Sequence, residues 1–528
     1  MAKSLKFRAS KQIYIPRSQL IISGFETPFA KELDQKNRWV IMAGLIPWDD
    51  IIFYYQKNLK NRWTGARSIN PRIAIGSLIV KFVEDLSDRD TITHIQENPY
   101  IQYFLGLGSF VKEPLFDASS LVDFRKRLSL ESLNEINEIL INRHLPVIVP
   151  KSKVTSEESQ EPVIEVLDQQ KSLEEVQNPA VETPVTQSKF YHGKMIIDAT
   201  AFPQDITYPT DIKLIYACIE KSQIIIDKLY DKKLHKKKPR TDRPNVRKQF
   251  LNVAQSKKPS KAKIQKGIKL LLTNLGRNIK SIHGLLEVDK KNILLKRLKP
   301  DMYKYLLVIQ TVHDQQKEMY REKKHQIGHR IVSIHQPHVR PIVRGKAHAS
   351  TEFGSKVLMS IMEGYTFLDL FSWEAYNEGI FLIESVDLYH KRFGYYPEKV
   401  LADKIFCNRE NRKKLKELGI MLGAKPLGRP KAEEPSLVSP GERNPIEAER
   451  RSGIIGQGKT RYGLNRIKAR LDITSKSWIA CTLMVLNLIK LIREASLWLV
   501  VSVINNENAI GKLLIVQRVT KFKLKMTA

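Results

Sequence analysis

Hydrophobic residues recur at helical spacing through the first quarter of the chain. Within residues 31–143, the segments IAIGSLIVKFVEDL and LVDFRKRLSLESLNEINEILINRHL place apolar residues three and four positions apart, the spacing of one buried helix face. Asp88 and Asn98 mark predicted helix boundaries, and Asn98 precedes Pro99, which disfavours helical geometry in the residue before it. The pattern predicts an all-α N-terminal domain, which we place at residues 1–145.

The hydrophobic pattern is lost in the segment that follows, at residues 146–190. Its sequence KSKVTSEESQEPVIEVLDQQKSLEEVQNPAVETPVTQSK is acidic, rich in Ser, Gln, Pro and Val, and poor in aromatic residues. This composition is typical of a disordered linker. Its negative charge argues against a position on nucleic acid.

A second domain begins with the short β-prone run Lys194–Ile197, which ends at Asp198. The pattern of about residues 212–330 then predicts helices. This segment is strongly basic, as in DKKLHKKKPRTDRPNVRKQF and KAKIQKGIKLLLTNLGRNIKSIHGLLE. Short β-rich pieces separated by Pro and Gly follow in residues 331–379. We therefore expect a β-containing domain that is interrupted by a helical insertion.

The remaining pattern predicts a strand, a loop, a helix and a strand in residues 397–425, with Asp403 at the end of the first strand. Further on, the apolar run WIACTLMVLNLIKLI predicts a helix that ends near Ile492. This run is too short to span a bilayer, so we interpret it as a buried helix.

Composition adds a strong preference for a polyanionic partner. The chain has 528 residues, a net charge of +32 and 42% hydrophobic residues, which suffices for several folded cores. A basic excess spread along the chain favours nucleic acid. The three cysteines are far apart and form no CxxC pair, which fits a reducing cytoplasm. The basic N-terminus lacks the apolar core of a signal peptide.

Acidic residues at the predicted strand ends suggest a metal site. Asp198 and Asp403 end two strands, and the stretch ERNPIEAERRSGIIGQGKTRYGL (residues 442–464) packs glutamates among cations before the long apolar helix. Carboxylate oxygens are the ligands that Mg²⁺ and Mn²⁺ prefer, and three acids can hold two such ions for phosphodiester chemistry. Spacing alone does not select three ligands among 56 acidic residues.

Ordered blocks of the chain resemble transposases of bacterial insertion sequences with an RNase H-like DDE catalytic domain. The blocks are IIDAT with DITYPTDIKLI (196–200 and 205–215), SIHQPHVRPIVRGKAHASTEFGSKV (333–357), VLADKIFCNRENRKKLKELGI (400–420), and RNPIE with GQGKTRYGLNRIKARL (443–447 and 456–471). The segments LSDRDTITHIQENPYIQYFLGL and PLFDASSLVDFRKRL are similar to the helical N-terminal domain of these proteins. The resemblance covers roughly residues 10–145 and 190–492.

The resemblance implies an α/β fold, with an RNase H-like catalytic domain that carries a largely helical insertion and follows an all-α N-terminal domain. The implied organisation is a DNA-end-binding domain at 1–145 and a DDE domain at 191–492 that contains the basic insertion at about 212–330, with the linker at 146–190 between them. The divergent basic tail at 493–528 resembles no part of the family. The resemblance also implies that Asp198, Asp403 and a glutamate hold Mg²⁺ (or Mn²⁺).

The third acid departs from the family's pattern, which reads Tyr, two residues, Arg, three residues, Glu, six residues, Lys. Arg443 and Glu447 fit the middle of this pattern, but Pro440 stands at the Tyr position and Lys459 comes five residues late. A five-residue insertion, Ala448–Ser452, accounts for the shift. On a continuous helix it would turn Lys459 away from the face of Glu447.

Three interpretations of this insertion stay open. Glu447 remains the ligand and the insertion is looped out, Glu449 replaces it, or the site is broken and this copy is inactive. We take Glu447 as the third catalytic and metal-binding residue.

Several cations near the blocks are candidates for contacts with the DNA backbone, because they flank the predicted acids. They are Arg443, Lys459, Arg461, Arg340, Arg344 and Lys346. Three nearby histidines, His335, His338 and His348, do not have the spacing of a helical ligand pair, and hard-ion chemistry does not need imidazole.

Two functions of different classes follow. The first is a DNA transposase that cleaves at the terminal inverted repeats of a mobile element and transfers the strand into target DNA. It would act as a homodimer in the bacterial cytoplasm, associated with the nucleoid and not with a membrane. The second is a catalytically inactive, transposase-derived DNA-binding protein. The geometry around residues 443–459 is expected to discriminate between them.

Overall fold

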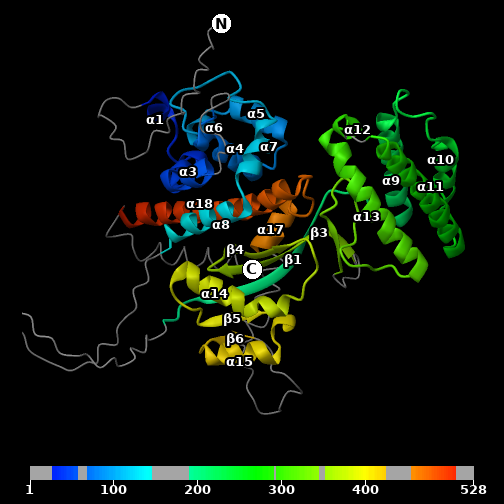
Figure 1. Ribbon diagram of the computed structural model, residues 1–528. Coiled ribbons are helices and arrows are strands. Elements are labelled where there is room, and N and C mark those ends of the chain that lie inside the picture. The colour runs from blue at the N-terminus through cyan, green and yellow to red at the C-terminus, as the bar shows by residue number, and fades with distance from the viewer. Residues whose placement is uncertain are drawn as a thin grey trace, which may run out of the picture.

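The computed structural model describes residues 27–57, 68–145, 190–289, 293–343, 351–423 and 453–506. Figure 1 shows three groups of elements: N-terminal helices, a sheet with its own helices, and a helical bundle to one side. The predicted linker at 146–190 lies outside the described residues except for Phe190, and the chain beyond Asn506 also lies outside them.

The described part of residues 1–145 is helical, as the hydrophobic spacing predicted. Its helices are α1 (Pro28–Glu32), α2 (Arg38–Leu45), α3 (Trp48–Lys57), α4 (Pro71–Val83), α5 (Asp88–Glu97), α6 (Pro99–Phe104), α7 (Ser120–Arg127) and α8 (Leu130–Asn142). The predicted boundaries at Asp88 and Asn98 are confirmed. Asn98 ends α5 and caps α6, because its side chain accepts hydrogen bonds from the backbone N–H groups of Tyr100 and Ile101.

A mixed sheet forms the centre of the second domain. Its strands are β1 (Lys194–Pro203), β2 (Arg340–Val343), β3 (Thr351–Met362), β4 (Tyr365–Ser372), β5 (Lys399–Ala402) and β6 (Met421–Gly423). The strand order is β2-β3-β1-β5-β6, and β4 pairs with β3 outside this path. β3 runs antiparallel to both β1 and β4, whereas β5 runs parallel to β1 and β6 parallel to β5.

Helices and short 3₁₀ turns connect these strands and cover them. They are η1 (Glu378–Phe381), α14 (Leu382–Phe393), η2 (Lys404–Phe406), α15 (Arg409–Glu417), α17 (Ile454–Arg461) and α18 (Asp472–Asn506). The predicted order of strand, loop, helix and strand in residues 397–425 is therefore confirmed. The prediction that the long helix ends near Ile492 is wrong, because α18 continues to Asn506.

The stretch Asp472–Ala495 of α18 is long and apolar enough to cross a membrane by length and composition, but 78% of its most apolar window is buried inside the protein. It packs between the N-terminal helices α4, α7 and α8 and strand β4. Consequently one continuous hydrophobic core joins the N-terminal helices to the sheet. Burial of this kind is typical of the core helix of a globular protein.

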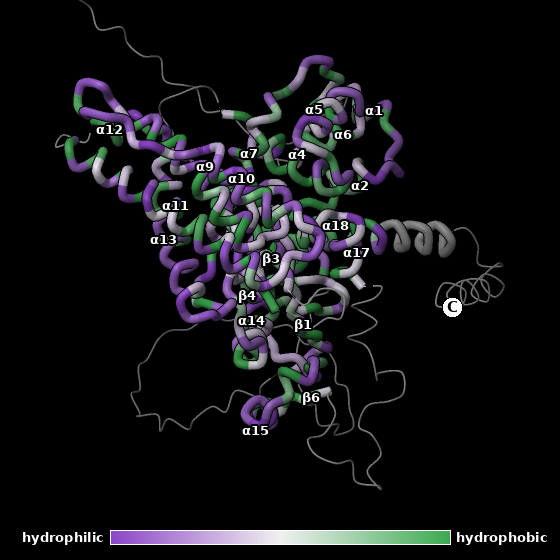
Figure 2. Tube along the Cα trace, turned by 90° about the vertical axis from the view of Figure 1, so that its right-hand side faces the viewer, coloured by the Kyte–Doolittle hydropathy of each residue, from purple (hydrophilic) through white to green (hydrophobic). Residues whose placement is uncertain are grey.

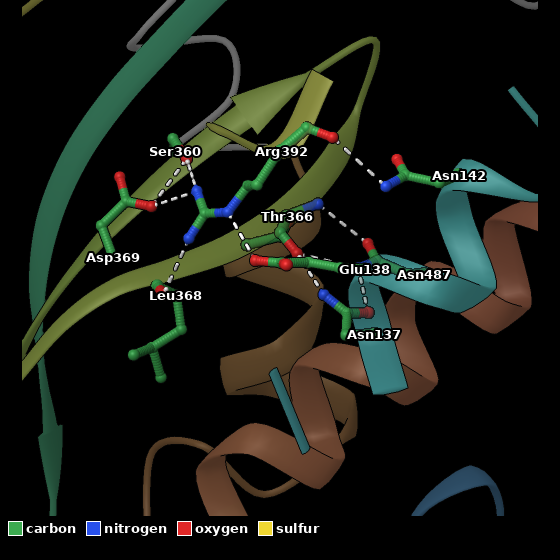
Figure 3. Close-up of polar contacts among 9 residues, drawn as sticks. All are labelled: Asn137, Glu138, Asn142, Ser360, Thr366, Leu368, Asp369, Arg392 and Asn487. Atoms are coloured by element: carbon green, nitrogen blue, oxygen red, sulfur yellow. Dashed lines mark hydrogen bonds and ion pairs between the residues drawn. The ribbon is translucent and has the colours of Figure 1, made fainter. Parts of the chain in front are cut away.

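Buried polar contacts also attach helix α8 to the sheet (Figure 3). The Arg392 guanidinium, on α14, donates to the carboxylates of Asp369 on β4 at 2.5 Å and of Glu138 on α8 at 2.7 Å. Beside this group, Asn487 of α18 donates to the side chain of Asn137 at 2.9 Å and to the Thr366 carbonyl at 2.8 Å. These contacts fix the N-terminal helices relative to the strands that carry the site.

The chain leaves the carboxyl end of β1 and enters a helical bundle with a hydrophobic core of its own. The bundle consists of α9 (Asp211–Leu229), α10 (Arg243–Ala254), α11 (Lys261–Glu287), α12 (Ile293–Lys296) and α13 (Pro300–Glu322). The predicted helical insertion of about 212–330 is therefore confirmed as a set of helices. In Figure 1 the bundle lies beside the sheet, and β1 leads towards it.

Candidate active site

The sheet brings Asp198 and Asp403 onto neighbouring strands. β1 and β5 pair in parallel, and Ile197 lies opposite Ala402. Asp198 and Asp403 are the next residues along each strand direction. Side chains at matching register positions of paired strands point to the same face of the sheet. The two carboxylates therefore belong to one face, at the carboxyl end of β5.

The two acids differ in their backbone setting. The prediction that the first strand ends at Asp198 is wrong, since β1 continues to Pro203 and Asp198 pairs with Met359 of β3 in its middle. Asp198 is only 4% exposed. Asp403 directly follows β5, as predicted, and its extended backbone precedes the 3₁₀ turn η2. One acid is thus fixed in the central strand, and the other lies in a strand-to-helix turn.

Helix α17 covers the same face of β1. The Lys459 ammonium donates to the Thr200 hydroxyl at 2.6 Å and lies 5.5 Å from the centre of the Phe202 ring. Thr200 and Phe202 follow Asp198 at intervals of two, so their side chains share its face. The predicted cation Lys459 therefore lies beside the acid pair, about 7 Å further along β1 at the ordinary strand rise.

The position at which α17 begins limits how Lys459 can be arranged relative to Glu447, the predicted third acid. α17 begins at Ile454, and Gly453 before it is extended with φ −78° and ψ 179°. Lys459 therefore does not share one continuous helix with Glu447. Glu447, its alternative Glu449 and the predicted DNA contact Arg443 lie outside the described residues.

Close packing holds α17 in place. A Cβ on Gly458 would lie 2.7 Å from a Leu464 methyl carbon and 3.0 Å from one of Leu486. Glycine at this position lets the helix approach α18 closely, which other residues would prevent. The neighbouring Lys459 is thereby directed at β1 by a rigid contact.

The other predicted DNA contacts are placed differently. Arg461 is exposed at the end of α17. Arg340, on β2, donates to the Glu374 carboxylate at 2.7 Å and to the Pro337 carbonyl at 2.5 Å. Its guanidinium therefore already binds partners within the protein. Arg344 and Lys346 lie outside the described residues.

The histidines of the middle block contact aromatic residues. His335 bonds to the Tyr305 hydroxyl at 2.7 Å. His338 lies 4.5 Å from the Trp373 ring, and burial lowers its pKa to about 4. At neutral pH its imidazole is therefore uncharged. His348 lies outside the described residues.

The donor set suits a hard divalent ion, because two carboxylates from adjacent strands supply oxygen ligands only. Among the residues that the structure describes, no group of three or more His, Cys, Asp and Glu could hold an ion. A third protein ligand would therefore have to come from elsewhere in the chain.

Sequence reasoning missed residues that border the site at the end of β1. Thr200 was not singled out, although its two-residue spacing from Asp198 in a strand could have indicated a shared face. The Ile467 N–H donates to the Pro203 carbonyl at 2.9 Å, and Arg466 donates to the Asp205 carboxylate at 2.9 Å. The basic run around Arg466 thus lines the same end of the strand.

Comparison with known proteins gives matches in both folded parts. Residues 28–127 match a family described as a transposase domain, and residues 400–489 match a transposase DDE domain. A curated relative, "Uncharacterized protein ORF8 in nfe locus" of Rhizobium meliloti, is 33% identical over 109 residues. This match covers 20% of the chain and about half (49%) of the relative. No solved structure gives a significant match.

The first match covers the N-terminal helices α1–α7, and the second covers part of the domain that contains the sheet. The second begins at Val400 and contains Asp403, Lys459 and most of α18. Both matches support an insertion-sequence transposase with a DDE domain.

Proposed function

We propose that this protein is a transposase that cleaves DNA at the ends of its mobile element and transfers the strand into target DNA, with Asp198 and Asp403 as metal ligands. The observation that carries the proposal is the β1–β5 register, which pairs Ile197 with Ala402, the residues immediately before the two aspartates. Asp403 follows the carboxyl end of β5, and ligands of parallel strands bind outside that edge of the sheet.

The strand arrangement supports an RNase H-like catalytic fold. β1, β3 and β4 form an antiparallel group in which β1 is followed in space by β3 and then β4. β5 and β6 extend the other side of β1 in parallel. Asp198 lies on β1 and Asp403 directly follows β5, the two strands where the antiparallel and parallel halves join.

Each residue of the site has a distinct task in this proposal. Asp198, buried in the central strand, and Asp403, in the turn after β5, would hold Mg²⁺ (or Mn²⁺). A bound divalent ion activates a water or a 3′-hydroxyl and stabilises the leaving oxygen in phosphodiester chemistry. The Lys459 ammonium would attract the DNA phosphate to this face, because cations position nucleic acid through its backbone.

Glu447 is the third metal ligand in the proposal. Because α17 begins at Ile454 and Gly453 before it is extended, Lys459 does not lie on one continuous helix with Glu447. The length of Ala448–Ser452 therefore does not fix the rotation between these two side chains. This supports a looped insertion. Arg443 and the exposed Arg461 would contact the DNA backbone nearby, and Arg344 and Lys346 would do so from the middle block. Arg340 would first have to release Glu374.

The assembly that we propose contains two subunits, because the two terminal inverted repeats of an element have to be handled together before they join the target. The N-terminal helices would contribute to end binding. Their shared core with the sheet means that an end held there has a fixed position relative to the acids.

Cleavage of a labelled duplex that carries the element's own ends tests the proposal. Nicking at the ends is expected with Mg²⁺ and not with EDTA. Asp198→Asn and Asp403→Asn should each abolish nicking while end binding persists. Asp387→Asn, at an exposed position of α14, is the matched control and should cleave normally. Full cleavage by either site variant would refute the assignment of these acids.

A second candidate function is DNA binding without catalysis. It is favoured by the displacement of Lys459, which stands five residues later than the family pattern places it relative to Glu447. In that case the wild-type chain binds ends and does not cleave them. Deletion of Ala448–Ser452 should then restore nicking, and failure of both proteins to nick would leave DNA binding as the function.

A further inference from the structure

Half of the chain's excess positive charge lies in one short part of the helical bundle. Residues 232–280 contain 17 Lys and Arg and a single acid, Asp242, a net charge of +16 out of +32 for the whole chain. The site does not use this segment. A concentration of charge of this kind is the electrostatic footprint expected of a nucleic-acid-binding surface.

These cations face the solvent. Of the 17, all except Lys263 are exposed. The structure pairs Lys238 and Arg243 with Asp227. Within the described residues no other cation of 232–280 forms an ion pair with an acid. Most of the positive charge of this segment is therefore not neutralised by the acids of the described residues.

Helix α10 arranges part of this charge on one face. The residues on its outward face are Arg243, Pro244, Arg247, Lys248, Leu251, Asn252 and Gln255, which line a surface hollow. The opposite face buries Val246 and Val253, and Phe250 stacks on Tyr216 of α9 at 4.0 Å. The apolar side of α10 is therefore buried in the bundle, and its polar side is available to a partner.

Helix α11 continues the charged surface. Its exposed cations Lys266, Lys269, Arg277 and Lys280 are three, eight and three residues apart, which places them in one stripe. The buried residues of α11, such as Leu271, lie on the opposite side and belong to the bundle core. Gln249 of α10 and Asn274 of α11 are hydrogen-bonded at 3.2 Å, so the two helices lie side by side.

The charged surface is separate from the catalytic acids. In Figure 1, α10 and α11 form the outer side of the bundle, and α13 lies nearer the sheet. Figure 2 shows hydrophilic residues along much of the bundle helices. α11 has 27 residues and is therefore about 40 Å long, enough to follow a full turn of duplex DNA, about 34–36 Å.

We propose that the outward side of α10 together with the cationic stripe of α11, which we call the α10–α11 face, is a second surface for duplex DNA. It binds chiefly the phosphate backbone, at a distance from Asp198 and Asp403. The identification of the partner as DNA rests on the proposed function. A single strand fits less well, because α11 has no Phe, Tyr or Trp and the Phe250 ring of α10 is already stacked, so the face offers no platform for bases.

The partner is also unlike a membrane surface. An amphipathic helix binds lipid through an apolar face that inserts between the headgroups. The apolar face of α10 is turned into the bundle, where Val246 is 1% exposed. The α10–α11 face therefore offers charge without an apolar anchor, as phosphate-backbone binding requires.

The test measures the salt dependence of duplex binding by the full chain that carries Asp198→Asn, in EDTA, so that cleavage does not contribute. The probe is a fluorescent 30-base-pair duplex, followed by anisotropy. Each phosphate contact contributes about 0.9 to the slope of log K against log salt. Arg247→Gln with Lys269→Gln should therefore lower the slope by about 1.8 and weaken binding at least tenfold near 0.1 M salt.

The control removes the same charge from another side of the bundle. Lys304→Gln with Lys317→Gln alters two exposed lysines of α13 and should leave the slope within about 0.5 of the unsubstituted value. Arg247→Lys with Lys269→Arg retains the charge and should retain the slope, which separates lost contacts from a disturbed fold.

Three results would overturn the proposal. The Gln pair on the α10–α11 face leaves the slope unchanged, both Gln pairs lower it equally, or double-stranded RNA of the same sequence competes as strongly as DNA. None of these depends on cleavage. Failure of the catalytic assignment would appear instead as absent Mg²⁺-dependent nicking by a chain that still shows the salt slope.

Discussion

Replacement of Arg392 by Met would remove the cation that pairs with Asp369 of β4 and Glu138 of α8. This cation links α14 to both of these elements. The Arg392 side chain is 6% exposed and that of Asp369 is 1% exposed. The guanidinium contacts Asp369 at 2.5 Å, and it also donates to the Ser360 hydroxyl at 3.2 Å. Glu138, the other acid, is 32% exposed. After the substitution Glu138 can regain water, but Asp369 remains buried without a counter-charge.

The expected loss of unfolding free energy follows from the unpaired carboxylate of Asp369. Removing one partner of a buried pair costs about 3–5 kcal/mol, because the remaining ion is desolvated without compensation. Burial already raises the pKa of Asp369 and the Arg392 guanidinium lowers it. Without Arg392, the folded-state pKa rises further above the unfolded value of about 3.9.

The stability of Arg392→Met depends on pH through Asp369. Because the folded-state pKa of Asp369 lies above the unfolded one, the folded variant holds a proton that the unfolded chain has released. Its stability is therefore highest at acidic pH and falls as the pH rises through the folded pKa. The difference between Arg392→Met and the wild type should accordingly be smaller at pH 5 than at pH 8.

Denaturant unfolding followed by tryptophan fluorescence measures this loss in the relevant core. The six tryptophans all lie outside residues 211–334, and Trp39, Trp48 and Trp478 belong to the core that joins the N-terminal helices to the sheet. The fluorescence change therefore includes unfolding of this core and does not come from tryptophans of the bundle. Arg143→Met removes an exposed ion pair with Asp50 at the end of α8 and should cost no more than about 1 kcal/mol. Arg392→Met with Asp369→Leu should recover most of the loss. A loss below about 1 kcal/mol for Arg392→Met, or an equal loss at both pH values, would refute the reasoning.

Two further outcomes are expected. Asn487→Leu leaves the buried N–H of Thr366 and the side-chain oxygen of Asn137 without the partner that Asn487 supplies, whereas the Thr366 carbonyl keeps its bond from Asn137. The free energy of unfolding should therefore fall by about 1–3 kcal/mol for each group left unpaired; unchanged thermal and denaturant midpoints would contradict this. All three cysteines are buried, and burial raises the pKa of the Cys481 thiol to about 12, so a thiol reagent at pH 8 should label the native chain negligibly and the unfolded chain at three sites. Rapid labelling of native protein would show that these thiols are exposed.

Local patterns were sufficient to predict most of the elements. Helical spacing identified the N-terminal helices, and turn residues around Asp403 located a strand and the helix after it. The end of β1 was predicted wrongly. Residues 199–203 carry little β signal of their own, and their strand conformation comes from pairing with β3, a contact made far along the chain.

The candidate site was predictable only in part for a similar reason. The two aspartates were found through a resemblance, and their adjacency follows from the register of β1 and β5. The contact of Lys459 with Thr200 joins residues 259 positions apart, which no periodicity indicates. The contact of α8 with the sheet through Asn137 could not be predicted either, because a hydrophobic pattern identifies a buried face but not the element that packs against it.

The most direct test of the central claim is a change of metal preference at Asp403. The claim is that the carboxylates of Asp198 and Asp403 together bind the catalytic ion. Asp403→Cys replaces a hard oxygen ligand by a thiolate, which Mg²⁺ accepts poorly and the softer Mn²⁺ accepts better. We predict that end cleavage by this variant is lost with Mg²⁺ and partly restored with Mn²⁺, whereas Asp403→Ala is inactive with both. Equal cleavage by the Cys variant with the two metals would contradict a direct metal contact at Asp403.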